Sequence, residues 1–147
     1  MQCHEPGVTR PGAVTSYPWS TFDLFPTLLG QAGVAAPEGI DSMDLSPVWK
    51  GESAALRDSL FTSYGKVQRS VRDLRWKLIR YHQFDEWELF DLEADPHELT
   101  NLYGTPGMEE RTRDLKRRLM QLRVQYGDDS DVSVQPAAWR KRFEVRR

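Results

Sequence analysis

Asp91, Glu93 and Asp95 alternate along the chain, at the spacing with which a calcium loop places its first oxygen ligands. Such a loop needs Gly at its sixth position and Glu at its twelfth, where this chain has Pro96 and Leu102. Asp side chains in turns commonly accept hydrogen bonds from nearby backbone N–H groups. The sequence therefore favours a turn held by Asp and Asn side chains, and we expect no metal site.

Basic side chains precede this loop, and three of them are candidates for holding an anionic substrate. Lys66, Arg69 and Arg72 recur every third residue. Ammonium and guanidinium groups are the usual partners of anionic oxygens in binding sites. The alternative is that the three pair with carboxylates of neighbouring strands or lie on solvated faces. The sequence leaves both interpretations open.

Cys3 is the single cysteine, so the chain has no intramolecular disulfide and no multi-cysteine metal site. His82 and His97 lie among turn residues and do not suggest a nucleophile and its base. The sequence also contains no glycine-rich phosphate loop. Catalytic residues are therefore not predicted.

Composition indicates a globular chain, with 39% hydrophobic and 29% charged residues among 147. The net charge of −2 does not identify a partner, and no apolar run reaches the roughly 20 residues that span a bilayer. The last eight residues, RKRFEVRR, hold five basic side chains and one acidic. A solvated terminus is the preferred interpretation of this tail, and we expect neither nucleic acid nor a membrane as partner.

The central part of the chain predicts a small α+β unit. β-branched and aromatic runs indicate four strands at 59–64, 67–73, 76–82 and 87–92, with connections too short for parallel crossovers. The basic residues of the first runs precede the acidic residues of the last, so opposite charges are expected to face each other across strands. Residues 108–126 form an amphipathic helix that should pack on one face of this antiparallel sheet, burying Trp76 and Trp87.

An earlier helix is predicted at 21–32, followed by a loop at 34–51. Its apolar face contains Leu24, Phe25, Leu28 and Leu29. Asp23 could be a catalytic carboxylate, but a helix cap is the preferred interpretation.

Two motifs in the central part of the chain carry a family resemblance. R-S-V-R-D-L-R-W-K-L-I-R-Y at 69–81 and W-E-L-F-D-L-E-A-D-P-H-E-L-T-N-L at 87–102 resemble the C-terminal subdomain of sulfatases of the alkaline-phosphatase-like superfamily. That family has R-x-V-R-x-x-x-x-K-L-I followed by E-L-Y-D-L-x-x-D-P-x-E-x-x-N-L, and Phe90 replaces its usual Tyr. The D-x-x-P-T-L-L motif also matches at 23–29, and P-G-x-x-x-P-G matches at 6–12.

The resemblance implies a domain plan. Residues 1–52 would be the end of a larger catalytic α/β domain, 53–130 the C-terminal subdomain, and 131–147 a basic tail. The fold class expected is α+β, a four-stranded antiparallel sheet with a C-terminal packing helix, preceded by a helix and loop of the larger domain. The missing N-terminal sulfatase domain would be its partner.

The resemblance also implies a chemistry. Sulfatases use a Cys or Ser in C/S-x-P/A-x-R, which is oxidised to formylglycine, together with calcium and basic side chains that hold the sulfate. Cys3 lacks the Pro two residues on and the Arg four residues on, and Ser16 has the Pro without the Arg. The chain is therefore expected to be the C-terminal fragment of a sulfuric ester hydrolase, inactive alone, with calcium and a sulfated small molecule or glycan bound by the full-length family.

Two other functions remain open. The chain could be a stand-alone binding module for an anionic partner, or a structural subunit that completes a separately encoded catalytic half. Full-length members are expected in the periplasm or secreted, whereas the compartment of this chain is left open.

Overall fold

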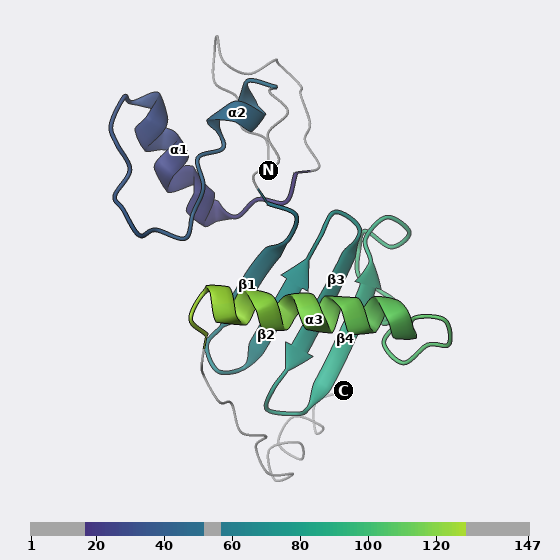
Figure 1. Cartoon of the computed structure of the whole chain (residues 1–147). Coiled ribbons are helices and arrows are strands. Elements are labelled where there is room, and N and C mark those ends of the chain that lie inside the picture. Colours follow the sequence, from purple (N-terminus) through teal and green to yellow (C-terminus); the bar gives the residue numbers. More distant parts are fainter. Residues whose placement is uncertain (1–16, 52–56, 129–147) are drawn as a thin grey trace, which may run out of the picture. The chain divides into compact units, whose positions relative to one another are not determined.

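The computed structural model describes residues 17–51 and 57–128 (Figure 1). The chain divides into two compact units, Met1–Leu60 and Phe61–Arg147. Cys3, the 6–12 motif and the basic tail lie outside the described residues, and the domain bounds proposed from the sequence stay a prediction.

The predicted four-stranded sheet is confirmed. Its strands are β1 (Leu60–Tyr64), β2 (Gln68–Arg72), β3 (Trp76–Tyr81) and β4 (Glu86–Asp91), in the order β1-β2-β3-β4. β2 pairs with β3, and β3 with β4, in antiparallel register. Successive strands are joined by only three or four residues, which allows this meander, since a parallel crossover needs far longer connections.

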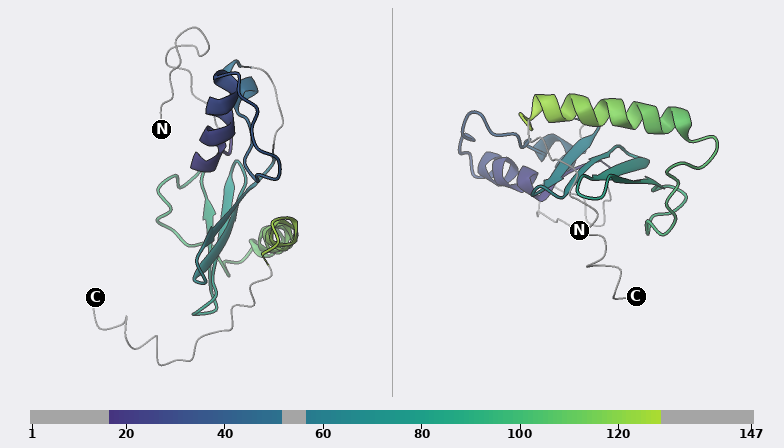
Figure 2. Two further views of the ribbon diagram at one scale, coloured as in Figure 1. Left: turned by 90° about the vertical axis from the view of Figure 1, so that its left-hand side faces the viewer. Right: turned by 90° about the horizontal axis from the view of Figure 1, so that it is seen from below.

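Helix α3 (Glu109–Gln125) lies across one face of the sheet, and this packing forms the core (Figure 2). Val71, Leu78 and Leu89 lie opposite one another in adjacent strands, and each is fully buried. The helix covers them with three leucines one turn apart, Leu115, Leu119 and Leu122. The predicted apolar stripe of the helix is confirmed. Trp76 and Trp87 are half-buried and pack against this cluster.

The expectation that opposite charges face each other across strands is wrong. In the observed register Arg69 lies opposite Arg80, and Arg72 lies opposite Lys77. On the β4 side, Arg80 lies opposite Trp87. The acidic partners are instead Asp91 at the end of β4, Asp85 in the turn before β4, residues of the loop after β4, and Asp128 after α3. Sequence order gave the charges of each strand but not the register that decides which of them meet.

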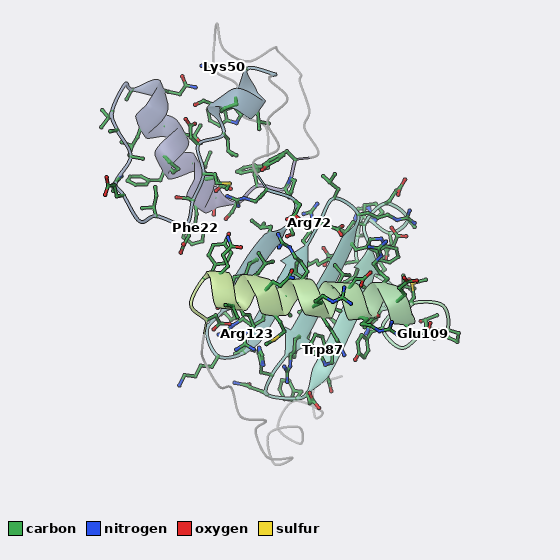
Figure 3. All side chains as sticks on the ribbon, viewed as in Figure 1. Phe22, Lys50, Arg72, Trp87, Glu109 and Arg123 are labelled. Carbon is green, nitrogen blue, oxygen red and sulfur yellow. The ribbon has the colours of Figure 1, made fainter. Side chains whose placement is uncertain are left out.

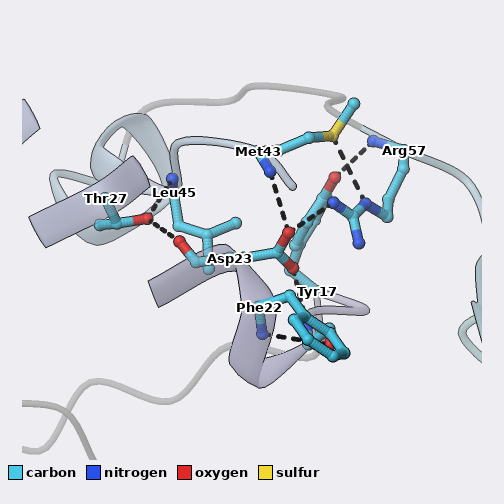
Figure 4. A network of polar contacts seen from close by, with 8 residues as sticks. Tyr17, Phe22, Asp23, Thr27, Met43, Leu45 and Arg57 are labelled. Atoms are coloured by element: carbon cyan, nitrogen blue, oxygen red, sulfur yellow. Dashed lines mark hydrogen bonds and ion pairs between the residues drawn. The ribbon is translucent and has the colours of Figure 1, made fainter. Parts of the chain in front are cut away.

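The first unit contains the turn η1 (Thr21–Asp23) and two helices, α1 (Leu24–Gln31) and α2 (Ser46–Trp49). Asp23 takes part in capping, as expected, but the N-cap residue is Ser20: in this capping box the Asp23 Oδ2 accepts the Ser20 backbone N–H at 2.7 Å. The Asp23 side chain makes no cap bond to α1 itself. Its Oδ1 accepts the Met43 N–H at 3.0 Å and the Arg57 guanidinium at 2.7 Å (Figure 4). Asp23 is 1% exposed, so this network joins the turn to the later loop.

The apolar face predicted for the helix at 21–32, which corresponds to η1 and α1, is only partly buried. Phe25 and Leu28 are 53% and 59% exposed, and Phe22 on the preceding turn is 79% exposed. The residues buried in the helix are Pro26 and Thr27. Thr27 Oγ1 donates to the Asp23 carbonyl at 2.6 Å and accepts the Leu45 N–H at 2.8 Å, so a polar contact holds the loop to the helix.

The core predicts a large effect of truncation at the centre of α3. Leu119→Ala should lower the free energy of unfolding by about 2–5 kcal/mol, because it removes a buried side chain and leaves a cavity. Urea denaturation followed by circular dichroism measures this change. Val124→Ala on the same helix is the control, since Val124 is 80% exposed and should change stability by less than about 0.5 kcal/mol. Equal losses in both variants would contradict the packing.

Candidate functional site

The three basic residues named from the sequence do not converge. Arg69 and Arg72 belong to β2, and their side chains project from opposite faces because they are three residues apart in a strand. Lys66 lies in the turn before β2, in which the Val67 N–H bonds the Tyr64 carbonyl at 3.1 Å. Lys66 and Arg72 are exposed. Within 17–51 and 57–128 the structure gives neither an ion-pair partner.

Arg69 is a buried anchor. Its side chain is 3% exposed and pairs with Asp128 through Nε at 2.6 Å and a terminal nitrogen at 3.0 Å. The other terminal nitrogen donates to the backbone carbonyl oxygens of Gly65, at 2.6 Å, and Gln68, at 2.9 Å. Arg69 therefore holds the turn that presents Lys66. Its role in substrate binding stays a prediction.

The acidic loop after β4 serves the fold. Asp91 accepts two bonds from Arg75, at 3.0 and 2.7 Å, and the backbone N–H groups of Glu93 and Ala94 at 3.2 and 3.4 Å. Hydrogen bonding from Arg75 lowers the pKa of the Asp91 carboxyl and raises the pKa of the guanidinium. Asp95 Oδ2 accepts the N–H groups of Leu99 and Thr100. The prediction of a turn held by Asp side chains is confirmed here.

The end of the loop covers β4, which is an edge of the sheet. Asn101 Oδ1 accepts the Leu89 N–H at 3.0 Å, and its amide donates to the Trp87 carbonyl at 3.1 Å. Lys77 on β3 pairs with Glu98 at 2.5 Å. An unpaired strand edge invites pairing with other chains, and these contacts block it.

A metal ion does not fit the described residues. The carboxylate oxygens of Asp91 and Asp95 already accept hydrogen bonds from Arg75 and backbone N–H groups. Within 17–51 and 57–128, no group of three or more His, Cys, Asp or Glu side chains could hold a metal ion. No step of chemistry is therefore assigned to a metal in this part of the chain.

His82 is a buried histidine among cations. It is 3% exposed, its backbone N–H bonds the Val67 carbonyl at 3.0 Å, and its Nε2 has no hydrogen-bond partner within the described residues. Burial, and then the charges of Arg80, Arg69 and Arg123, lower the pKa of His82 to about 4. The imidazole is neutral at pH 7.

Sequence reasoning missed the partners that fix these residues. Asp128 lies 59 residues after Arg69, and Arg57 lies 34 residues after Asp23. Neither pair has a local spacing signal, because both form only when separate elements pack. Arg123 on α3 also bonds Asp128, at 2.9 Å, so that one carboxylate joins two guanidinium groups.

Comparison with known proteins identifies the family of this chain. Residues 1–125 match the family described as N-sulphoglucosamine sulphohydrolase, C-terminal. The chain belongs to this sulfatase family. Its match runs through the α1 segment, the sheet and the whole of α3, and the resemblance seen in the sequence is confirmed.

Individual proteins similar to this chain are also sulfatases. It is 30% identical to the N-acetylglucosamine-6-O-sulfatase of Bacteroides thetaiotaomicron over 136 residues, which cover 84% of this chain and 24% of that protein. A solved structure with D-glucosamine-2-N,6-O-disulfate as its substrate gives a TM-score of 0.67 at 29% identity, covering 74% of this chain and 24% of the other. A 2-O GAG sulfatase gives 0.66 at 28% identity, covering 78% and 27%.

The sulfatase chain spans about a quarter of the length of the curated relatives it matches. Its fold agrees with the corresponding part of alkaline-phosphatase-like sulfatases. The family generally uses a metal ion, which the described residues of this chain do not hold. Among those residues, no helix combines the length and apolar character needed to cross a membrane.

The Arg75–Asp91 contact predicts that Asp91 stabilises the start of the loop after β4. Asp91→Asn should lower the melting temperature by several degrees, because it removes the charge that Arg75 and two N–H groups bind. Glu93→Gln is the control, since Glu93 also reaches Arg75 but its side chain is 72% exposed and should contribute little. Differential scanning calorimetry compares them, and a larger loss in Glu93→Gln would contradict this assignment.

His82 predicts a pH-dependent stability. Below pH 6.5 the unfolded imidazole binds a proton, whereas the folded one stays neutral down to a pKa of about 4. The free energy of unfolding should therefore fall between these values, by at most about 3 kcal/mol and less where solvent screens the guanidinium groups. His82→Gln should flatten this dependence in urea titrations at pH 4–7.

The exposed His97 supplies the matched control for this titration. His97→Gln should keep the slope of the parent chain between pH 6.5 and 4. A slope that survives His82→Gln unchanged would show that other groups cause it.

Proposed function

We propose that this chain is the C-terminal part of a sulfuric ester hydrolase that acts on sulfated sugars. The observation that carries the proposal is the family match over residues 1–125, combined with a span of only a quarter of the relatives. Names among the relatives include N-acetylglucosamine-6-O-sulfatase and ulvan-active sulfatase, which point to sulfated saccharides as the substrate class.

The chain is inactive alone in this proposal. Cys3 lacks the residues of the formylglycine motif, and calcium would be held by carboxylates of the larger N-terminal domain. Phe22, Phe25 and Leu28, each more than half exposed, would contact that domain, because a large apolar surface in water marks a partner site or a liability to aggregate.

In this proposal the turn before β2 gives this part of the chain a share in substrate binding. Lys66 is exposed on a turn that Arg69 holds through the Gly65 carbonyl. Lys66 precedes β2 and Arg72 ends it, so in the proposed role the two contact separate anionic groups of the substrate, and Arg69 contributes by fixing the turn. The positive charge of each would stabilise sulfate oxygens through charge-assisted hydrogen bonds.

A second function has some support in the same residues. A stand-alone module that binds an anionic partner, or that completes a separately encoded catalytic half, would also use exposed Lys66 and Arg72. The two functions differ in whether hydrolysis returns when a catalytic domain is supplied.

A domain exchange tests the proposal. The chain alone should hydrolyse no aryl sulfate above background, with or without calcium. Replacing the matching C-terminal quarter of the Bacteroides N-acetylglucosamine-6-O-sulfatase with this chain should return sulfate release from N-acetylglucosamine-6-sulfate. A chimera that folds but stays inactive would favour the stand-alone module, and turnover by the isolated chain would contradict the proposed incompleteness.

The chimera also tests the basic residues. Lys66→Ala should lower kcat/KM about 10- to 100-fold if the ammonium binds an anionic group of the substrate, the loss expected for one charge-assisted hydrogen bond. Arg113→Ala on α3 is the control, because Arg113 is also exposed and its removal changes the net charge equally. Unchanged kcat/KM in both variants would remove Lys66 from the binding site.

A further inference from the structure

Two cationic side chains lie against the ring of Trp87 on β4, and the sulfatase assignment does not explain them. The Lys116 ammonium from α3 lies 4.2 Å from the centre of the indole, and the Arg80 guanidinium from β3 lies 5.2 Å from it. Tyr103 stacks on the same indole, with ring centres 5.9 Å apart and planes inclined by 9°. Three elements and the loop after β4 thus place two positive groups around one ring.

These contacts fix the position of both cations. Lys116 Nζ donates to the Tyr103 hydroxyl at 2.7 Å and lies 4.9 Å from that ring as well. A long basic side chain on a surface helix is ordinarily mobile, and ordering it on binding costs free energy. Here the aromatic rings order it in advance. Figure 3 shows Trp87 beside α3, on the other side of the helix from Arg72 in that view.

Among the described residues these two cations have one acidic contact, and it is weak. Within the described residues Lys116 has no acidic partner, and the nearest acid of Arg80 is Asp85 at 3.8 Å, whose side chain is 61% exposed. Arg80 Nε has no hydrogen-bond partner there. Asp128, which follows α3, is bound by Arg69 and Arg123, and His82 is neutral. Positive charge therefore remains at Trp87.

The other half-buried tryptophan shows that this is not a general property of the sheet. Trp76 also carries two cations, Arg75 at 5.2 Å and Arg111 at 5.4 Å from its ring. Arg75, however, is bound by Asp91 at 2.7 Å and Glu93 at 3.2 Å. The cations at Trp76 are thus accompanied by two carboxylates. The leucines of α3 already cover the sheet. The packing of the helix therefore does not depend on the cations at either tryptophan.

We propose that Lys116, Arg80 and Trp87 form a binding site for an acidic saccharide, in which sulfate or carboxylate groups of one sugar chain pair with the two cations. Ammonium and guanidinium groups that are ordered and partly desolvated bind anionic oxygens more strongly than mobile surface ones. The choice of a saccharide as ligand rests on the proposed function, since both cations would also attract other polyanions.

Titration of the 147-residue chain with a size-defined sulfated glycosaminoglycan hexasaccharide tests the site. Isothermal titration calorimetry at low salt should detect binding that weakens as salt rises. Lys116→Gln and Arg80→Gln should each raise Kd about fivefold, as expected for loss of one partly exposed charge pair. In NMR spectra the Trp87 indole N–H should shift on addition, and that of Trp76 should not.

Arg111→Gln is the matched control, because it removes one positive charge from a cation–aromatic contact on the same helix. Its Kd should stay within twofold of the parent chain. Lys116→Arg keeps the charge and should retain binding. Circular dichroism of Lys116→Gln, compared with Lys116→Arg, would show whether a loss of binding is caused by misfolding.

Four results would overturn the proposal. Equal weakening by Arg111→Gln and Lys116→Gln would show attraction by net charge alone. Binding of an unsulfated, uncharged hexasaccharide with the same Kd would remove the role of the anionic groups. An oligonucleotide of matched charge that binds equally well, or no binding of the sulfated hexasaccharide, would exclude a saccharide site. None of these readouts measures hydrolysis, so the sulfatase assignment is judged separately by the domain exchange.

Discussion

The ion pair between Arg75 and Asp91 is the contact on which the rest of the sheet–helix unit depends. Arg75 lies just before β3 and Asp91 ends β4, so the pair joins adjacent strands at one end of the sheet. Asp91 also accepts two backbone N–H groups of the residues that follow. The chain therefore turns at once after β4, and the loop is directed back along that strand, where Asn101 bonds its edge.

That return path fixes the position of α3. Because the loop runs along β4 before the helix begins, Leu115, Leu119 and Leu122 meet the buried row of the sheet. The loop also brings Tyr103 to Trp87, and α3 brings Lys116 to both rings. The cation–aromatic cluster is thus a consequence of the same loop that closes the sheet edge, and its acidic contact within the described residues is the exposed Asp85.

The residues of the two family motifs have structural roles in the sheet and its loop. Asp91, Asp95, Glu98 and Asn101 of the second motif each have a partner in the sheet or the loop, and Lys77 of the first motif is the partner of Glu98. The motifs therefore occur together because their residues bond each other. They identify a sulfatase C-terminal part, and the hydrogen bonds and ion pairs of these residues hold the sheet and its loop.

The sequence by itself determined the elements and the family. Alternating aromatic and β-branched residues predicted the four strands, leucines one turn apart predicted α3, and the paired motifs predicted the sulfatase relationship. Each of these signals is local, since strand and helix periodicities and turn residues act within a few positions. The turn interpretation of the acidic loop also followed from residue types alone.

Only the tertiary structure decided which charges meet. Register placed Arg69 opposite Arg80, where sequence order suggested opposite charges, and packing joined Arg69 to Asp128 across 59 residues. Burial of His82 and the approach of Lys116 to Trp87 likewise have no local signal. A one-residue change of register exchanges the faces of a strand, so the environment of each ionic group depends on contacts that form only when the sheet, its loop and α3 pack together.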